Sequence, residues 1–402
     1  MSDKRTSPEL TGMPYYRVVG EVPRKRHVQF RRPDGGLYAE ELMGEEGFSS
    51  DSSLLYHRYL PTAIIKSEAV AEEPRSELAA NLPLSPRHFR TTELPETGDL
   101  VTGRHLLAGN GDVRISYASA RSASELYRNS MGDECVYVQS GQVRLETTYG
   151  AIDAGPGDYL VIPTGTIHRW VPAGEPVTVL AVQAAGHIRP PKRYLSQYGQ
   201  LLEHAPYSER DLRGPTEPLQ RDGTDVPVLV RTRGGLTRLT YKNHPFDVVG
   251  WDGYLYPYAF NIADFEPIVK RTHAPPPVHQ TFEGPGFVIC SFCPRPLDFH
   301  PEAIPIPYNH HNVDSDEFMF YVGGDYSARK GSGIDVGSIS LHPAGFTHGP
   351  QPGAVEAVVE AVSRGVGTTS ELAVMIDTFR PLDLGPAALA CEDSAYAWTW
   401  AR

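Results

Sequence analysis

Two stretches of this chain repeat one spacing of glycine, proline and histidine, and this repeat constrains the fold more than any other feature. Both follow the pattern G-x5-P-x-G-x2-H. The two copies are Gly157, Pro163, Gly165 and His168, and Gly337, Pro343, Gly345 and His348. Upstream, Glu134 precedes Gly141 by seven positions, as Glu317 precedes Gly324. Agreement at all of these positions indicates an internal repeat.

The residue types of the repeat indicate two small β-barrels. A strand that carries the glutamate turns at the glycine, and a second hairpin with Pro-x-Gly delivers the histidine at the end of the facing strand. The glutamate and the histidine then point inward together. This two-motif spacing is typical of cupins, whose jelly-roll, or double-stranded β-helix, barrels hold a metal in their mouth. We therefore predict a mainly β bicupin with N-terminal arms and a short helical connector.

The strand and turn signals divide the chain into two parts. Short apolar runs before about residue 100 predict strands and extended arms, and a dense β pattern spans residues 100–190. The polar segment 192–225 contains the helix candidates, at 194–204 and 207–212. We expect residues 1–265 to form an arm, a degenerate cupin barrel and the connector. Residues 266–402 should form a metal-binding barrel.

Composition argues against several classes of protein. The 402 residues carry a formal net charge of −12, which disfavours nucleic-acid binding because phosphate contacts need clustered Lys and Arg. No apolar run approaches the roughly 20 residues of a membrane span, and the first residues lack the apolar core of a signal peptide. Four cysteines are too few for a disulfide framework. We expect a soluble, cytoplasmic protein.

The second copy of the repeat predicts a metal site. A third ligand is expected from a histidine six positions before the glutamate, and His311 occupies that position. His311, Glu317 and His348 then form the 2-His-1-carboxylate set of Fe(II) oxygenases, which leaves positions open for substrate and O2. Mn, Ni and Zn suit the same donors. The adjacent His310 should face away from the metal.

The first copy lacks this third donor. Six positions before Glu134 lies Arg128, and seven before it lies Tyr127. Glu134 and His168 alone are too few to hold a catalytic metal. We therefore expect the first barrel to be structural.

Longer runs of sequence resemble the homogentisate 1,2-dioxygenase family over most of the chain. Leu37–Leu42 and Leu55–Pro61 look like the family's "LYAEQL…LYRILP" stretch, and Pro245–Gly253 looks like its "PF-VV-W-G" segment. Pro307–Tyr308, and then His342 through Pro350, match its metal region. The resemblance implies an Fe(II) enzyme that opens homogentisate with O2 to maleylacetoacetate in tyrosine and phenylalanine catabolism. It also implies a homo-oligomer, a trimer or hexamer.

The resemblance also implies roles for individual residues. His311, Glu317 and His348 fall on the iron ligands. Tyr326 falls on a tyrosine that holds the substrate carboxylate, and His342 on a second histidine that contacts substrate, beside His348. His273 falls on the histidine that acts as acid/base, with His279 as the alternative six residues later.

Two rival functions stay open at this point. A related cupin dioxygenase could keep the metal triad and cleave another hydroquinone acid, such as gentisate. A cupin of a different class could use its metal without oxygenase chemistry.

Overall fold

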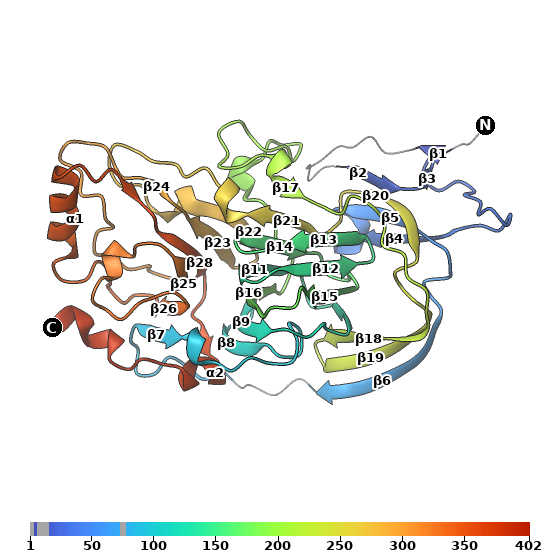
Figure 1. Cartoon of the computed structure of the whole chain (residues 1–402), viewed down its shortest axis with the longest axis horizontal. Coiled ribbons are helices and arrows are strands. Elements are labelled where there is room, and N and C mark those ends of the chain that lie inside the picture. The colour runs from blue at the N-terminus through green and yellow to red at the C-terminus, as the bar shows by residue number, and fades with distance from the viewer. Residues whose placement is uncertain (1–3, 6–15, 73–77) are drawn as a thin grey trace.

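The computed structural model describes residues 4–5, 16–72 and 78–402, and its elements are mainly antiparallel β-strands (Figure 1). Two sheets enclose the core of the first barrel. One has the strand order β13 (Gly150–Ala154), β12 (Val143–Thr147), β15 (His168–Pro172), β10 (Leu126–Asn129), β18 (Thr224–Thr232), β19 (Gly235–Asn243) and β6 (Ile64–Glu72). The other has the order β17 (Leu212–Arg213), β21 (Tyr258–Asn261), β14 (Asp158–Ile162), β11 (Glu134–Ser140), β16 (Val177–Ala184), β9 (Val113–Ala120), β8 (His105–Gly109) and β29 (Asp383–Leu384).

Strand β11 shows why this sequence forms a core on both sides of one sheet. Val136 and Val138 pack inside the first barrel, in a cluster that includes Trp170. Cys135 and Tyr137 point to the other face and join a cluster shared with the second barrel. Because successive side chains alternate between two buried faces, the strand is a nearly continuous apolar run.

A third sheet forms the second barrel. Its order is β22 (Gln280–Gly284), β23 (Phe287–Phe292), β28 (Leu372–Thr378), β25 (Asp316–Gly323), β26 (Ser338–His342) and β7 (Arg87–Arg90). Irregular chain at 297–315, the pair β24 (Arg295–Pro296) and β27 (Thr368–Thr369), and helix α1 (Ala354–Ser363) contribute residues to a cavity on this sheet. The predicted mainly β bicupin architecture is confirmed.

Each half of the chain contributes a strand to the other half. Strand β7, from the first hundred residues, pairs with β26 at the edge of the second barrel. Strand β29, near the C-terminus and just before helix α2 (Pro386–Ala390), pairs with β8 of the first barrel. These additions cover strand edges that would otherwise expose unpaired backbone groups.

The N-terminal arms form a small sheet beside the first barrel (Figure 1). It has the order β2 (Arg17–Gly20), β20 (Val248–Gly253), β5 (Ser52–His57) and β4 (Ala39–Gly44), and a further pair joins β1 (Lys4–Arg5) to β3 (Val22–Pro23). Trp251 of β20 is fully buried and donates from Nε1 to the Tyr149 carbonyl, at 2.7 Å. This hydrogen bond connects the small sheet to the first barrel.

The helices predicted in the connector are wrong. In place of helices at 194–204 and 207–212, the structure has short 3₁₀ turns at Lys192–Tyr194 and Glu209–Asp211. Pro206 and Gly199 interrupt the region, and both disfavour a continuous helix. Among the described residues, no helix is both long enough and apolar enough to cross a membrane.

Candidate metal centre

Three side chains converge at the mouth of the second barrel. His310, Glu317 and His348 each offer one ligand atom, and these atoms lie within 4.8 Å of one another. The Nε2 atoms of His310 and His348 lie 3.9 Å and 3.7 Å from Oε2 of Glu317. Glu317 stands near the start of β25, His348 follows β26, and His310 precedes β25.

The backbone sets the orientation of both imidazoles. Nδ1 of His310 lies 2.9 Å from the Tyr308 carbonyl, and Nδ1 of His348 lies 3.0 Å from the Phe346 carbonyl. A carbonyl only accepts, so each Nδ1 carries the proton and donates it. In the neutral imidazole, a proton on Nδ1 leaves a lone pair on Nε2, which is the form that binds a metal.

The candidate triad differs from the predicted one at one position, because His310 and not His311 lies beside Glu317. His310 forms an antiparallel bridge with His348, with backbone N–H···O distances of 2.8 Å in both directions. Residues directly opposite in such a pair have side chains on the same face, and the two rings are 4.4 Å apart. His311, the next residue along, is exposed and faces Thr347 at 3.4 Å.

His342 also differs from its predicted place, because it lies behind the triad and does not line the cavity. It pairs with Glu317 across β25 and β26, and its Nδ1 donates to Oε1 of Glu317 at 2.8 Å. Its Nε2 accepts from the Tyr396 hydroxyl at 2.9 Å. His342 is fully buried and stacks on His348, with ring centroids 4.1 Å apart. Burial, and then the charge of Arg329, lower its pKa to about 3, so it is neutral.

The donor set fits a divalent metal ion. Burial raises the pKa of Glu317, but its contacts with His310, His342 and His348 outweigh burial and hold that pKa well below its usual range. Its Oε1 is engaged by His342, which leaves Oε2 directed at the two histidines. Nε2 of His348 is buried without a hydrogen-bond partner. A bound cation would satisfy that lone pair and the carboxylate together.

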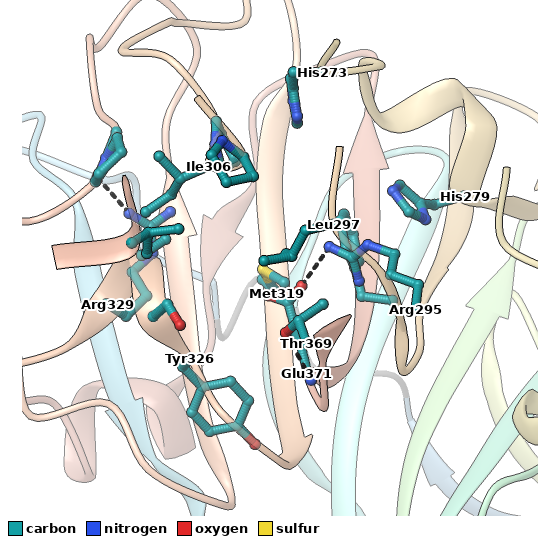
Figure 2. Close-up of a pocket in the computed structure, with 18 of the residues that line it drawn as sticks. His273, His279, Arg295, Leu297, Ile306, Met319, Tyr326, Arg329, Thr369 and Glu371 are labelled. Carbon is teal, nitrogen blue, oxygen red and sulfur yellow. Dashed lines mark hydrogen bonds and ion pairs between the residues drawn. The ribbon is translucent and has the colours of Figure 1, made fainter. Parts of the chain in front are cut away.

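A cavity of about 480 Å³ opens beside His310 and Glu317. Figure 2 shows part of its lining. Leu297, Ile306, Met319 and Phe292 form much of its apolar wall. His273, His279 and Tyr326 all line it, so the structure brings these predicted residues together in one cavity. Figure 2 shows His273 and His279 toward one end and Tyr326 toward the other.

The two candidate acid/base histidines have different surroundings. His273 is 24% exposed, its ring meets Tyr308 edge-on at 5.4 Å, and burial lowers its pKa. His279 is 5% exposed and stacks on Phe292 at 4.4 Å, and burial lowers its pKa to about 3. Tyr308 also meets His310 edge-on at 6.1 Å, so His273 is linked through this ring to the triad.

Several residues that line the cavity lie outside every sequence motif and were not predicted. Arg295 donates to Glu371 at 2.7 Å, and Figure 2 shows this pair in the cavity. Arg329 is buried and donates to the Gly349 carbonyl at 2.6 Å, with its Nη2 4.0 Å from Glu317. Asp377 lies opposite Glu317 in the β25–β28 pair. The only sequence signal that His310 could be the third donor was that it is adjacent to His311. The sequence alone did not show which of the two histidines points toward Glu317.

Another three-residue group, Glu45, Asp133 and His187, has ligand atoms within the same 4.8 Å limit. Arg189 already forms an ion pair with Glu45, and Asp133 accepts from the Thr164 and Ile188 amides at 2.8 Å. Since these partners occupy the oxygens, the group is an ion-pair network.

Two family models together match most of the chain. The model "Homogentisate 1,2-dioxygenase N-terminal" matches residues 16–262, and "Homogentisate 1,2-dioxygenase C-terminal" matches residues 273–402. The second match includes all three triad residues and His273.

Individual relatives cover almost the same span. A Saccharolobus solfataricus protein named "Putative dioxygenase" is 37% identical, over 96% of this chain and 99% of its own length. A homogentisate 1,2-dioxygenase of Emericella nidulans is 28% identical, over 86% of this chain and 81% of its own. A solved cupin 2 conserved barrel domain protein from Leptotrichia buccalis is 10% identical, covers 76% of this chain and 99% of its own, and has a TM-score of 0.30. With both family models matched along its length, the chain belongs to the homogentisate 1,2-dioxygenase family.

Proposed function

We propose that this protein is an Fe(II)-dependent dioxygenase that opens the ring of homogentisate with O2 to give maleylacetoacetate. Both oxygen atoms enter the product. The observation that carries the proposal is the triad His310, Glu317 and His348, with both imidazole Nε2 atoms directed at one carboxylate oxygen beside a cavity. Iron bound there would supply the redox and Lewis-acid chemistry that ring cleavage by O2 requires.

The cavity suits a small aromatic acid. Its volume of about 480 Å³ and its apolar wall are typical of a site that encloses one organic molecule. We assign to Tyr326 the contact with the substrate carboxylate, with Arg295, a cation that lines the same cavity, as the alternative. Holding the carboxylate and the ring together orients the substrate for reaction.

His273 is the proposed acid/base. Its lowered pKa keeps the imidazole neutral at pH 7, so it can accept a proton from a ring hydroxyl. Its position beside Tyr308, which also contacts His310, favours it over His279. His273→Gln should lower kcat by about 100-fold or more, whereas His279→Gln should have the smaller effect. A larger loss of kcat in His279→Gln than in His273→Gln would instead assign the acid/base role to His279.

Oxygen uptake tests the proposed reaction. Protein loaded with Fe(II) should consume O2 on addition of homogentisate and form the absorbance of the ring-fission product, and metal analysis should find iron in preference to Mn, Ni or Zn. Uptake with gentisate and none with homogentisate would favour the related dioxygenase of different substrate. No uptake with either acid would favour a cupin without oxygenase activity.

We expect the enzyme to act in tyrosine and phenylalanine catabolism, in the cytoplasm, and to assemble as a trimer or hexamer. The small N-terminal sheet beside the barrel is the kind of arm that can contact a neighbouring subunit. Light scattering coupled to size-exclusion chromatography would measure the assembly, and a monomer would contradict it.

A further inference from the structure

Two irregular segments of the second half lie side by side next to His273. One precedes the 3₁₀ turn Pro276–His279, and the other follows strand β24. The backbone N–H of His300 donates to the Arg271 carbonyl at 2.7 Å. This hydrogen bond lies two residues after Asp298 on one segment and two residues before His273 on the other. The backbone therefore brings the side chains of Asp298 and His273 together.

Asp298 and His273 form a close pair of titratable groups. Nδ1 of His273 lies 3.8 Å from Oδ2 of Asp298, within the range of an ion pair when the imidazole is protonated. The two side chains are 24% and 13% exposed, so water screens their attraction only in part. In the part of the chain that the structure describes, His273 is the only ion-pair partner of this carboxylate.

The carboxylate lies on the side of His273 that faces away from the substrate cavity. His273 lines both the cavity of about 480 Å³ and a smaller one of about 50 Å³. Asp298 lines the smaller cavity and not the larger one. Since Nδ1 faces Asp298, Nε2 is the nitrogen left for the larger cavity. A proton on Nδ1, donated to the carboxylate, leaves the lone pair on Nε2, as a base requires.

The other groups around His273 all oppose its protonation. Burial has the largest effect and lowers its pKa, and the charges of Arg295 and His310 lower it further. His279, which also lines the smaller cavity, is a further basic group nearby. Asp298 is the group that raises the pKa of His273. Without the charge of Asp298, His273 should therefore be harder to protonate.

We propose that Asp298 is a positioning residue for His273, which holds the proton on Nδ1, directs Nε2 toward the substrate and stabilises the imidazolium. This role rests on the proposed function, in which His273 takes a proton from a ring hydroxyl. That proton moves from the hydroxyl oxygen to Nε2 and later passes to the product or to water. Asp298 remains a carboxylate throughout. The 3.8 Å separation should shorten to a hydrogen bond when substrate is bound.

Variants of Asp298 test the proposal in the iron-loaded, full-length protein. Asp298→Asn keeps the shape of the side chain and removes its charge. It should lower kcat with homogentisate by about tenfold or more and change KM little, because the residue acts on proton transfer and not on binding. Asp298→Glu restores the charge and should recover most of the loss. Glu302→Gln is the matched control, since Glu302 is an exposed carboxylate on the same segment.

A second measurement follows His273 directly and needs no turnover. Exchange of its C2 hydrogen for deuterium, measured by mass spectrometry across a pH series, gives the midpoint of its titration. The midpoint should lie at lower pH in Asp298→Asn than in wild type, Asp298→Glu or Glu302→Gln. Asp298→Ser is measured alongside, so that a folding defect in one variant, visible as a lowered Tm, leaves the other to decide.

The two measurements separate the proposal from the proposed function. An unchanged midpoint in the uncharged variants, or a kcat equal to that of wild type, would overturn the role of Asp298. A shifted midpoint together with a lowered kcat that Asp298→Glu restores supports it. If the wild type fails to consume O2 with homogentisate, the proposed function is wrong, and the midpoint still decides whether Asp298 pairs with His273.

Discussion

His310 and His311 are adjacent in the chain, and the bridge between His310 and His348 gives them different environments. His310 lines the cavity together with Glu317, whereas His311 is exposed. In extended chain, successive side chains point to opposite faces, so only one of the two can reach the carboxylate. Their chemistry is identical, which makes them a matched pair for an experiment.

Substituting each histidine by alanine tests which one binds the metal. His310→Ala should reduce bound metal from about one ion per chain to nearly none, because two donors remain. His311→Ala should keep the full metal content and activity. Elemental analysis of the purified variants measures this, and equal metal loss in both would contradict the assignment of His310.

The hydrogen bond from Tyr396 to His342 should influence the metal without touching it. Tyr396→Phe removes the donor to Nε2 of His342, which loosens the imidazole that orients Glu317. Changes to such supporting groups weaken metal binding by about 10- to 100-fold. Tyr198→Phe is the control, since Tyr198 is 85% exposed. A competition titration with a metal chelator gives both affinities, and equal values for the two variants would refute the role of Tyr396.

At the scale of elements, the strand register of the N-terminal sheet creates an ion-pair group around the buried His57. His57, at the end of β5, places Nδ1 2.6 Å from Asp247 and Nε2 2.9 Å from Glu41. Burial lowers the pKa of His57, but the two carboxylates outweigh burial and raise it to about 9. The protonated imidazole thus links β4, β5 and the segment before β20.

This group predicts a pH dependence of stability. Because the folded pKa of His57 is raised, its contribution is complete below about pH 6.5, the usual histidine value, and is lost as the pH rises through about 9. The full contribution is about 3 kcal/mol. The difference in urea midpoint between wild type and His57→Gln should therefore be large at pH 6 and small at pH 10.

The control for this measurement is His27→Gln, since the His27 side chain is 91% exposed. Its difference from wild type should stay small at both pH values. A gap between wild type and His57→Gln that is constant from pH 6 to pH 10 would rule out the charged His57 group.

At the scale of the whole molecule, one apolar cluster joins the two barrels. Phe282, on β22 of the second half, is fully buried and lies 5.7 Å from Tyr159 and 6.2 Å from Phe260 of the first half, between ring centroids. The Tyr159 hydroxyl is also 2.8 Å from that of Ser291. With the exchanged strands β7 and β29, these contacts couple the halves.

Coupling of this kind predicts that one core substitution destabilises both barrels. Phe282→Ala should cost about 3–5 kcal/mol and leave a single unfolding transition at a lower temperature. Hydrogen exchange should speed up in β11 and β25 alike. Phe299→Ala, at a residue that is 62% exposed, is the control. Faster exchange confined to β25 would show that the barrels unfold separately.

The sequence by itself determined the features that depend on local spacing. The two copies of the motif predicted two barrels, and they identified Glu317 and His348, because a hairpin of given length delivers its end residues to one place. The same spacing identified Glu134 and His168 as a pair without a third histidine. The family resemblance pointed to the residues of the cavity, including His273 and Tyr326.

The tertiary structure decided what depends on pairing between distant segments. A shift of one residue in register turns a side chain to the opposite face, and only the bridge to His348 selects His310 over His311. The placement of His342 behind Glu317 depends on Tyr396, 54 residues later in the chain. In the first barrel, the cationic partner of Glu134 is likewise distant, because it is Arg104, 30 residues earlier in the chain. No local pattern marks such partners, because their contacts exist only after the strands have paired.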